Sequence, residues 1–429
     1  MNKKLKSILI IVFSILIIAG VATALRFTVF TKNAFAMKTP NGAVDLLKGG
    51  TGKLSVDEQV FYNSNFIKAS TAFQFDLLKA AAIEDKNTFL SPLSVGIALT
   101  MTANGADGET LDAFEDVLGM SLSELNKFYG AAQKRLSQSE KPTILNLANA
   151  VFFDKNRVNV SDDFIADCKS YFLSGFYSMD FSSPNSVKNI NDWVKDNSKG
   201  KIQGMIERID PLQIMFLANA VYFDGKWATK FNEKDNYFRD FATPSGNVKT
   251  EFMQRKIKCR YFYNYSDNGI AAAILPYKGG EYSFAVIMPD NDFNDWLNEF
   301  TAEDYFALIN KTREDEIPVG LPKFEANFSY ELTEPLVNIG LAVAFDREFA
   351  DFTRIDDNVY LFDVPHKTYL KVDEEGTVAV AITMPSLAKK SADPELEAVI
   401  FDKPFLYVII ENETKLPIFM GVMNDPTAK

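Results

Sequence analysis

The sequence predicts an α+β fold, in which paired strands are interleaved with helices in one large domain. Apolar runs of strand length are joined in pairs by short polar turns, and stretches with apolar residues at helical spacing lie between them. The chain has 429 residues, of which 47% are hydrophobic, so it is long enough to bury a large core.

The strands are indicated by runs of apolar residues. Residues 145–153 and 216–223 are almost continuously apolar, which is typical of strands that are covered on both faces. Two pairs of runs predict hairpins. The first pair is 271–276 and 282–289 around Lys278-Gly279-Gly280, and the second is 405–410 and 416–422 around Asn412-Glu413-Thr414-Lys415.

Helices are indicated by apolar residues that recur at a period near 3.6. Residues 66–78 predict an amphipathic first helix. Three further helices are expected at 161–172, at 186–198, where Gly200 follows as a stop signal, and at 295–310.

The N-terminus has the pattern of an export signal. Lys3, Lys4 and Lys6 precede an apolar run over 8–25, as in the basic and hydrophobic regions of a secretory signal. Two small-x-small sites, at 22–24 and 34–36, could be cleaved, and an uncleaved membrane anchor is the alternative. We expect residues 1–36 to be one or the other, and the rest of the chain to be secreted or tethered at the cell surface.

Residues 37–58 are rich in turn formers and predict a linker. No second linker or repeat follows, so we expect residues 59–429 to form a single domain. The net charge of −12 and the lack of a basic stripe exclude a nucleic-acid partner. One histidine and two distant cysteines, Cys168 and Cys259, offer no metal-ligand spacing, and we expect no cofactor. Their spacing leaves open whether these cysteines pair.

His366 is the only histidine, so a hydrolase hypothesis would pair it with Ser91 or Ser94. The chain contains no G-x-S-x-G elbow to support this hypothesis. A lone histidine is more often a hydrogen-bonded core residue than a catalytic base. We therefore expect that the protein is not an enzyme.

Residues 376–394, GTVAVAITMPSLAKKSADP, begin with strand chemistry and end with loop chemistry. The first eight are small or β-branched, whereas the later ones include Pro385, Lys389 and Lys390. This combination suggests a segment that is exposed in one state and paired in another.

The sequence resembles the serpin family over residues 66–426. The motifs that carry the resemblance follow one another in the order and spacing of that family. They are Asn87-Thr88-Phe89-Leu90-Ser91-Pro92-Leu93-Ser94, Ile190-Asn191-Asp192-Trp193-Val194, Asn219-Ala220-Val221-Tyr222-Phe223-Asp224-Gly225-Lys226-Trp227, Leu321-Pro322-Lys323-Phe324, His366-Lys367, Asp373-Glu374-Glu375-Gly376-Thr377 and Lys403-Pro404-Phe405.

The resemblance implies about nine helices around three β-sheets, with an exposed reactive loop near the C-terminus. It also implies two structural clusters in the large central sheet. Ser91, Ser94, Asn219 and His366 match the shutter, a hydrogen-bonded cluster beneath the middle of the sheet. Trp227 and Glu374 match the breach, where the loop first enters the sheet.

Glu374, Glu375, Gly376 and Thr377 match the hinge of the reactive loop. Alternate side chains of a strand share a face, so Thr377, Ala379 and Ala381 would turn inward on insertion. We expect Thr377 to lie near the surface before the loop is cut.

The resemblance places the reactive bond fourteen residues after the hinge glycine, at Lys390-Ser391, with Lys389 as the alternative. A basic residue there matches a trypsin-like serine protease. The expected function is suicide inhibition by a monomer, in which loop insertion traps the covalent acyl-enzyme. A non-inhibitory serpin that binds or carries a ligand is the alternative, and Pro385 departs from the pattern of an inserting strand.

Overall fold

The computed structural model describes residues 37–47, 54–137, 142–263, 269–357, 359–377 and 398–428. It confirms the α+β class, because strands from all parts of residues 43–423 form large sheets with helices packed against them. Residues 39–429 form one compact unit.

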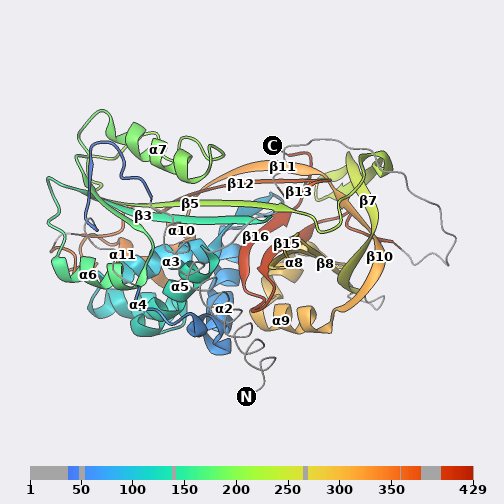
Figure 1. Cartoon of the computed structure of the whole chain (residues 1–429), viewed down its shortest axis with the longest axis horizontal. Helices are drawn as coiled ribbons and strands as arrows, with labels where there is room; N and C mark the ends of the chain where they lie inside the picture. The colour runs from blue at the N-terminus through green and yellow to red at the C-terminus, as the bar shows by residue number, and fades with distance from the viewer. Residues whose placement is uncertain are drawn as a thin grey trace, which may run out of the picture. The chain divides into compact units, whose positions relative to one another are not determined.

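The central sheet contains the strands that position the candidate site (Figure 1). Its order is β1-β4-β3-β5-β13-β12-β11. The strands are β1 (Ala43–Asp45), β3 (Ile144–Asp154), β4 (Gly175–Met179), β5 (Met215–Lys226), β11 (Phe324–Glu331), β12 (Pro365–Asp373) and β13 (Gly376–Thr377). The runs predicted at 145–153 and 216–223 are β3 and β5, and both are buried along most of their length, as their continuous apolar character requires.

The other strands form one continuous network in the order β14-β10-β7-β8-β9-β15-β16-β2, with β6 paired to β7. They are β2 (Thr88–Leu90), β6 (Tyr237–Thr243), β7 (Gly246–Tyr263), β8 (Ile270–Pro276), β9 (Tyr282–Pro289), β10 (Arg313–Pro322), β14 (Val399–Ile400), β15 (Phe405–Glu411) and β16 (Pro417–Met423). The 18-residue strand β7 pairs with β6 and β10 and, at its other end, with β8. It thereby joins what would otherwise be a second and a third sheet.

Helices cover both faces of the central sheet (Figure 1). Helix α7 (Ser186–Asn197) packs on β5 from one side, and α3 (Pro92–Ala103) and α5 (Leu122–Leu136) lie on the other side, against β3. The remaining helical segments are η1 (Glu58–Tyr62), α2 (Ser64–Ala81), α4 (Gly108–Leu118), α6 (Asp162–Tyr171), η2 (Glu233–Asp235), α8 (Phe293–Glu299), α9 (Ala302–Lys311), α10 (Thr333–Leu336), η3 (Val337–Leu341) and α11 (Ala342–Phe345).

Helix α3 has no polar face, because all twelve of its residues are buried. Pro92 occupies the first turn, where its missing N–H is not needed. This burial places Ser91, the residue before the helix, and Ser94 directly beneath the central sheet.

The prediction of one helix over residues 295–310 is wrong, because two helices occupy this stretch. Helix α8 ends at Glu299, and Thr301 begins α9 with a capping box in which its hydroxyl accepts from the Asp304 N–H and the Asp304 carboxylate accepts from the Thr301 N–H. The cap satisfies N–H groups that a continuous helix would bond internally, so the first helix stops there.

The prediction that residues 37–58 form a linker is wrong for the described part of this stretch. Strand β1 pairs antiparallel with β4, and the Leu46 N–H donates to the Phe176 carbonyl at 2.8 Å. Val56 is buried. The apolar residues between the turn formers therefore dock this segment on the edge of the central sheet.

Both cysteines are free and buried. Burial raises the pKa of the Cys259 thiol to about 12 and holds the pKa of the Cys168 thiol well above its ordinary value, so neither is a reactive thiolate. Among the described residues no helix is long and apolar enough to cross a membrane. The predicted signal or anchor at 1–36 lies outside the described residues.

Candidate functional site

The structure brings the four predicted shutter residues together at the boundary between β5 and β12. We call this boundary the seam. Asn219 on β5 lies opposite His366 on β12 in a parallel pairing that includes only one further residue pair. The Asn219 side-chain amide donates to Ser94 Oγ at 2.7 Å, and the Ser91 N–H donates to His366 Nε2 at 3.1 Å. The prediction that these residues form one cluster is consistent with these contacts.

Asn149 on β3 completes the cluster, since its side-chain oxygen accepts from the Ser94 hydroxyl at 3.0 Å. Sequence reasoning missed this residue, although it lies directly opposite Asn219 on the neighbouring strand. Repeated Leu-Ala-Asn-Ala segments on β3 and β5 were a signal that could have revealed it. The cluster therefore links α3 to three strands of the central sheet.

The environment of His366 is that of a structural residue. Its side chain is fully buried, and desolvation lowers its pKa to about 4. Because Nε2 accepts a hydrogen bond, the ring is neutral with its proton on Nδ1. Ser91 donates its hydroxyl to the Ile418 carbonyl rather than to His366, so the pair does not have the arrangement of a nucleophile and its base.

The seam is incompletely paired along its length. Above Lys367 and Ala220, toward the carboxyl ends of both strands, the described residues show no further β5–β12 pairing, and β13 lies between the strands at the top. Three buried polar atoms of the cluster, on Asn149, Asn219 and His366, lack a hydrogen-bond partner among the described residues. Since each unsatisfied group costs about 1–3 kcal/mol, the closed seam is a weak point of the sheet.

The breach residues lie where β13 meets β5. The Trp227 ring stacks on Tyr277 with centroids 4.8 Å apart, and its indole N–H donates to the Asp373 carbonyl at 2.8 Å. The Trp227 backbone N–H donates to the Glu375 carbonyl at 3.0 Å. Trp227 thus fixes the turn that connects β12 to β13.

Glu374 is held in this turn by charged and polar groups. Its carboxylate pairs with Lys323 at 2.9 Å and accepts a hydrogen bond from the Asn236 amide. Burial acts to raise the pKa of Glu374, but the hydrogen bonds from Lys323 and Asn236 outweigh it and leave the pKa lowered. Glu375 pairs with Lys230. Both hinge carboxylates are therefore anchored to the body of the protein.

Thr377 is fully buried, so the prediction that it lies near the surface is wrong. It pairs with Val372 of β12 and Gly225 of β5, and its hydroxyl shares a hydrogen bond of 2.5 Å with the Tyr277 hydroxyl. Thr377 can enter the sheet because the residue before it is Gly376, which has a φ of +153°. A Cβ at this position would lie only 2.1 Å from the Gly225 carbonyl oxygen, so only glycine lets the chain pass this close to β5.

The described part of the hinge ends at Thr377. Ala379, Ala381, Pro385, Lys389, Lys390 and Ser391 lie outside the described residues. Sequence reasoning missed Tyr277, whose hydroxyl hydrogen-bonds to that of Thr377, and assigned no role to Lys323. Among the described residues no group of His, Cys, Asp and Glu could hold a metal ion.

The comparisons with known proteins agree with this geometry. The family model described as "Serpin (serine protease inhibitor)" matches residues 68–426. The chain belongs to the serpin family. An uncharacterized serpin-like protein of Thermococcus kodakarensis is 30% identical over 90% of this chain and 89% of its own length. The plasma serine protease inhibitor of Mus musculus is 31% identical over 83% of this chain and 90% of its own length.

Solved serpin structures confirm the fold. The native state of the thermophilic serpin tengpin has a TM-score of 0.81 at 31% identity and covers 89% of this chain and 99% of its own. A complex of thyroxine-binding globulin with thyroxine has a TM-score of 0.76 at 23% identity and covers 85% of this chain and all of its own. The serpin fold is thus shared with proteins described as inhibitors and with one described as a thyroxine binder.

Proposed function

We propose that this serpin inhibits a trypsin-like serine protease as a suicide substrate. The protease serine would attack the carbonyl carbon of Lys390 and form an ester. The bond to the Ser391 nitrogen would break, and the new Ser391 amine would leave with the proton that the protease histidine delivers. Insertion of the freed loop between β5 and β12 would then carry the tethered protease along the sheet.

The observation that carries the proposal is the position of β13. Its two residues already lie between β5 and β12, antiparallel to both, in the register that an inserted strand requires. The following residues continue with small and β-branched side chains. Insertion would therefore extend an existing strand, without the cost of nucleating a new one.

The driving force can be estimated from the new strand. About a dozen new backbone hydrogen bonds at roughly 1 kcal/mol each amount to on the order of 10 kcal/mol, before side-chain burial is added. At about 3.3 Å per residue, fourteen inserted residues would span roughly 46 Å. These magnitudes support trapping, because the energy and the displacement are both large compared with those of a local rearrangement.

The sequence supports the proposed partner and location. Lys390, or Lys389 as the alternative, favours a protease whose specificity pocket holds a carboxylate. The pattern of residues 1–36 favours export, as a secreted protein or one tethered by an uncleaved segment. The protein would act as a monomer, because the mechanism requires one loop and one sheet.

We expect the protein and trypsin to form a complex that survives boiling in detergent. The complex should be visible on a denaturing gel as a new band near the summed mass of the protease and the inhibitor without its C-terminal fragment. Catalytically inactive trypsin, with its serine replaced by alanine, serves as the control and should give no such band. Complete cleavage by active trypsin, subtilisin and elastase without any covalent band would contradict the proposal.

The C-terminal fragment that is released from this complex should begin at Ser391. Mass spectrometry of the fragment measures this directly. A fragment that begins at Lys390 would move the reactive bond by one residue. If another protease forms the complex instead and its fragment begins near Met384 or Pro385, the target is elastase-like or chymotrypsin-like rather than trypsin-like.

The alternative is a serpin that binds a ligand and does not insert its loop. The described hinge favours insertion, because Thr377 is small and already buried, whereas a bulky or charged residue there would block it. The two functions differ in the gel experiment, since a non-inserting serpin would be cut by trypsin and leave it active.

A further inference from the structure

A second connection between β5 and β12 lies where both strands begin, at the end of the seam opposite the breach. The Gln213 side-chain amide donates to the Asp363 carboxyl at 2.6 Å. Gln213 is two residues before β5, and Asp363 is two residues before β12. The hydrogen bond therefore joins the two halves of the central sheet below the shutter.

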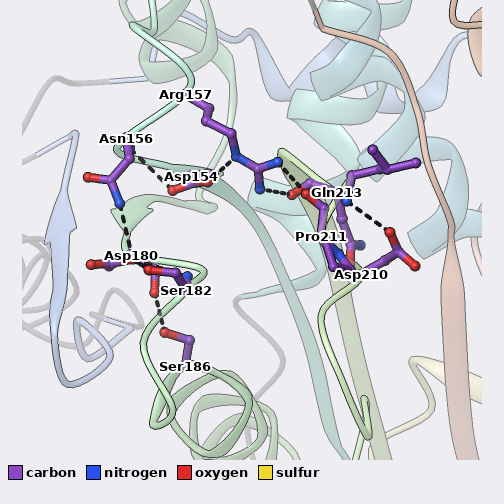
Figure 2. A network of polar contacts seen from close by, with 10 residues as sticks. Asp154, Asn156, Arg157, Asp180, Ser182, Ser186, Asp210, Pro211 and Gln213 are labelled. Carbon is purple, nitrogen blue, oxygen red and sulfur yellow. Dashed lines mark hydrogen bonds and ion pairs between the residues drawn. The ribbon is translucent and has the colours of Figure 1, made fainter.

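Gln213 is held firmly on the β5 side of this connection (Figure 2). The Arg157 guanidinium donates to the carbonyls of Pro211 and Gln213 at 2.6 and 2.5 Å and pairs with Asp154 at the end of β3. The Gln213 N–H donates to the Asp210 carbonyl at 3.0 Å. Only 2% of Gln213 is exposed.

Asp363 is held on the other side by the end of β11. Glu331 accepts the Val364 N–H at 2.7 Å, and the Leu332 N–H donates to the Val364 carbonyl at 3.0 Å. The charged groups around Asp363 are thus mostly carboxylates: Glu331 from β11 and Asp210 from the turn before β5. The Arg157 guanidinium donates to the carbonyls of Pro211 and Gln213 in that turn.

We propose that Gln213 and Asp363 form a pH-sensitive clasp, held by Arg157, that closes the lower end of the seam and must open before the loop can insert fully. This inference rests on the proposed function. The inserted strand would run antiparallel to β5, with Gly376 opposite Lys226. Each step forward along the inserted strand is therefore one step back along β5. Lys390, fourteen residues after Gly376, would then lie opposite Leu212, so the strand would pass Gln213.

The pH dependence follows from the environment of Asp363. Burial, together with Glu331 and Asp210, raises its pKa from 3.8 to about 7. The closed clasp thus favours the protonated form, whereas an opened, solvated Asp363 would titrate near its ordinary value. The stability of the closed clasp is therefore full below pH 4 and is lost progressively as the pH rises to about 7.

Hydrogen exchange in the uncut, full-length protein tests the clasp. The backbone N–H groups of residues 212–217, 361–364 and 366 report its opening, after correction for the intrinsic pH dependence of exchange. Between pH 5 and pH 7.5 we expect opening in the parent to increase about tenfold or more. Asp363→Asn keeps the acceptor oxygen but never carries a charge, so its opening should change less than about twofold.

Two further variants test whether the exchange depends on the Gln213–Asp363 hydrogen bond itself. Gln213→Leu removes the donor and should open readily at both pH values. Asp315→Asn removes an exposed carboxylate on β10, and this control should behave like the parent. Equal exchange in the parent and Asp363→Asn at both pH values would overturn the clasp.

The consequence for insertion is measured separately. After the loop is cut at pH 7.5, Asp363→Asn should gain heat resistance several-fold more slowly than the parent, and equal rates would contradict the role of the clasp in insertion. If neither protein ever gains heat resistance, the proposed inhibitory function fails, and the exchange rates of the uncut protein still decide whether the clasp exists.

Discussion

Cutting the loop should raise the melting temperature of this protein by about 10–20 °C. Insertion adds on the order of 10 kcal/mol to the stability of the folded state, and each kcal/mol shifts the melting temperature of a large domain by roughly 1–2 °C. The inserted strand would replace the weak seam at His366 and Asn219 with pairing to both neighbours. Differential scanning calorimetry before and after a single cut measures the shift.

A matched cut outside the loop is the control for this experiment. A nick within residues 264–268, between β7 and β8, should leave the melting temperature level or lower it, as is usual for a nicked chain. An unchanged melting temperature after a confirmed cut in the loop would contradict insertion. Pro385 would then be the first residue to replace, because proline cannot donate to a central strand.

Replacing Thr377 with arginine should convert the inhibitor into a substrate. Insertion would bury a guanidinium beside Tyr277 without a partner, at an effective cost of several kcal/mol. Since each 1.36 kcal/mol slows a step tenfold, insertion should slow by about a hundredfold or more. The protease would then hydrolyse the ester first, so the moles of inhibitor consumed per protease inactivated should rise about tenfold or more.

Because Thr377 is buried before cleavage, Thr377→Arg should also destabilise the uncut protein. Arginine would expel β13 from the sheet, and the loss of its pairing and of the Tyr277 contact should lower the unfolding free energy by about 1–3 kcal/mol. Denaturant unfolding of the uncut protein measures this loss.

Thr377→Val is the matched control, because it keeps the size of the side chain and removes only the hydroxyl. It should be destabilised by about 1–3 kcal/mol through the unpaired Tyr277 hydroxyl, yet inhibit within about twofold of the parent. If Thr377→Arg inhibits as well as Thr377→Val, Thr377 is not an inward-facing hinge residue.

Much of the fold followed from patterns that depend on short stretches of chain. The buried strands β3 and β5 are continuous apolar runs, and β8 with β9 flank a glycine turn. Helix α3 was not predicted, because a helix buried on all sides has no amphipathic period. Strand β7 was missed for a related reason, since one strand that serves two sheet regions changes its burial pattern along its length.

The candidate site could be predicted only where a motif identified it. Ser91 and Ser94 are far from Asn219 and His366 in the sequence, and the serpin resemblance alone placed the four together. Tyr277 and the pair Gln213 and Asp363 lie outside those motifs, and their contacts join residues 100 and 150 positions apart. Contacts of this kind depend on strand register, which a single sequence does not specify.

The structure of the cut protein tests the central claim most directly. In a crystal structure of the protein cleaved once in the loop, residues 377–390 should form a full strand between β5 and β12, with Asn219 and His366 separated and Gln213 released from Asp363. A cleaved structure in which Asn219 still pairs with His366 and β13 still ends at Thr377 would contradict the account.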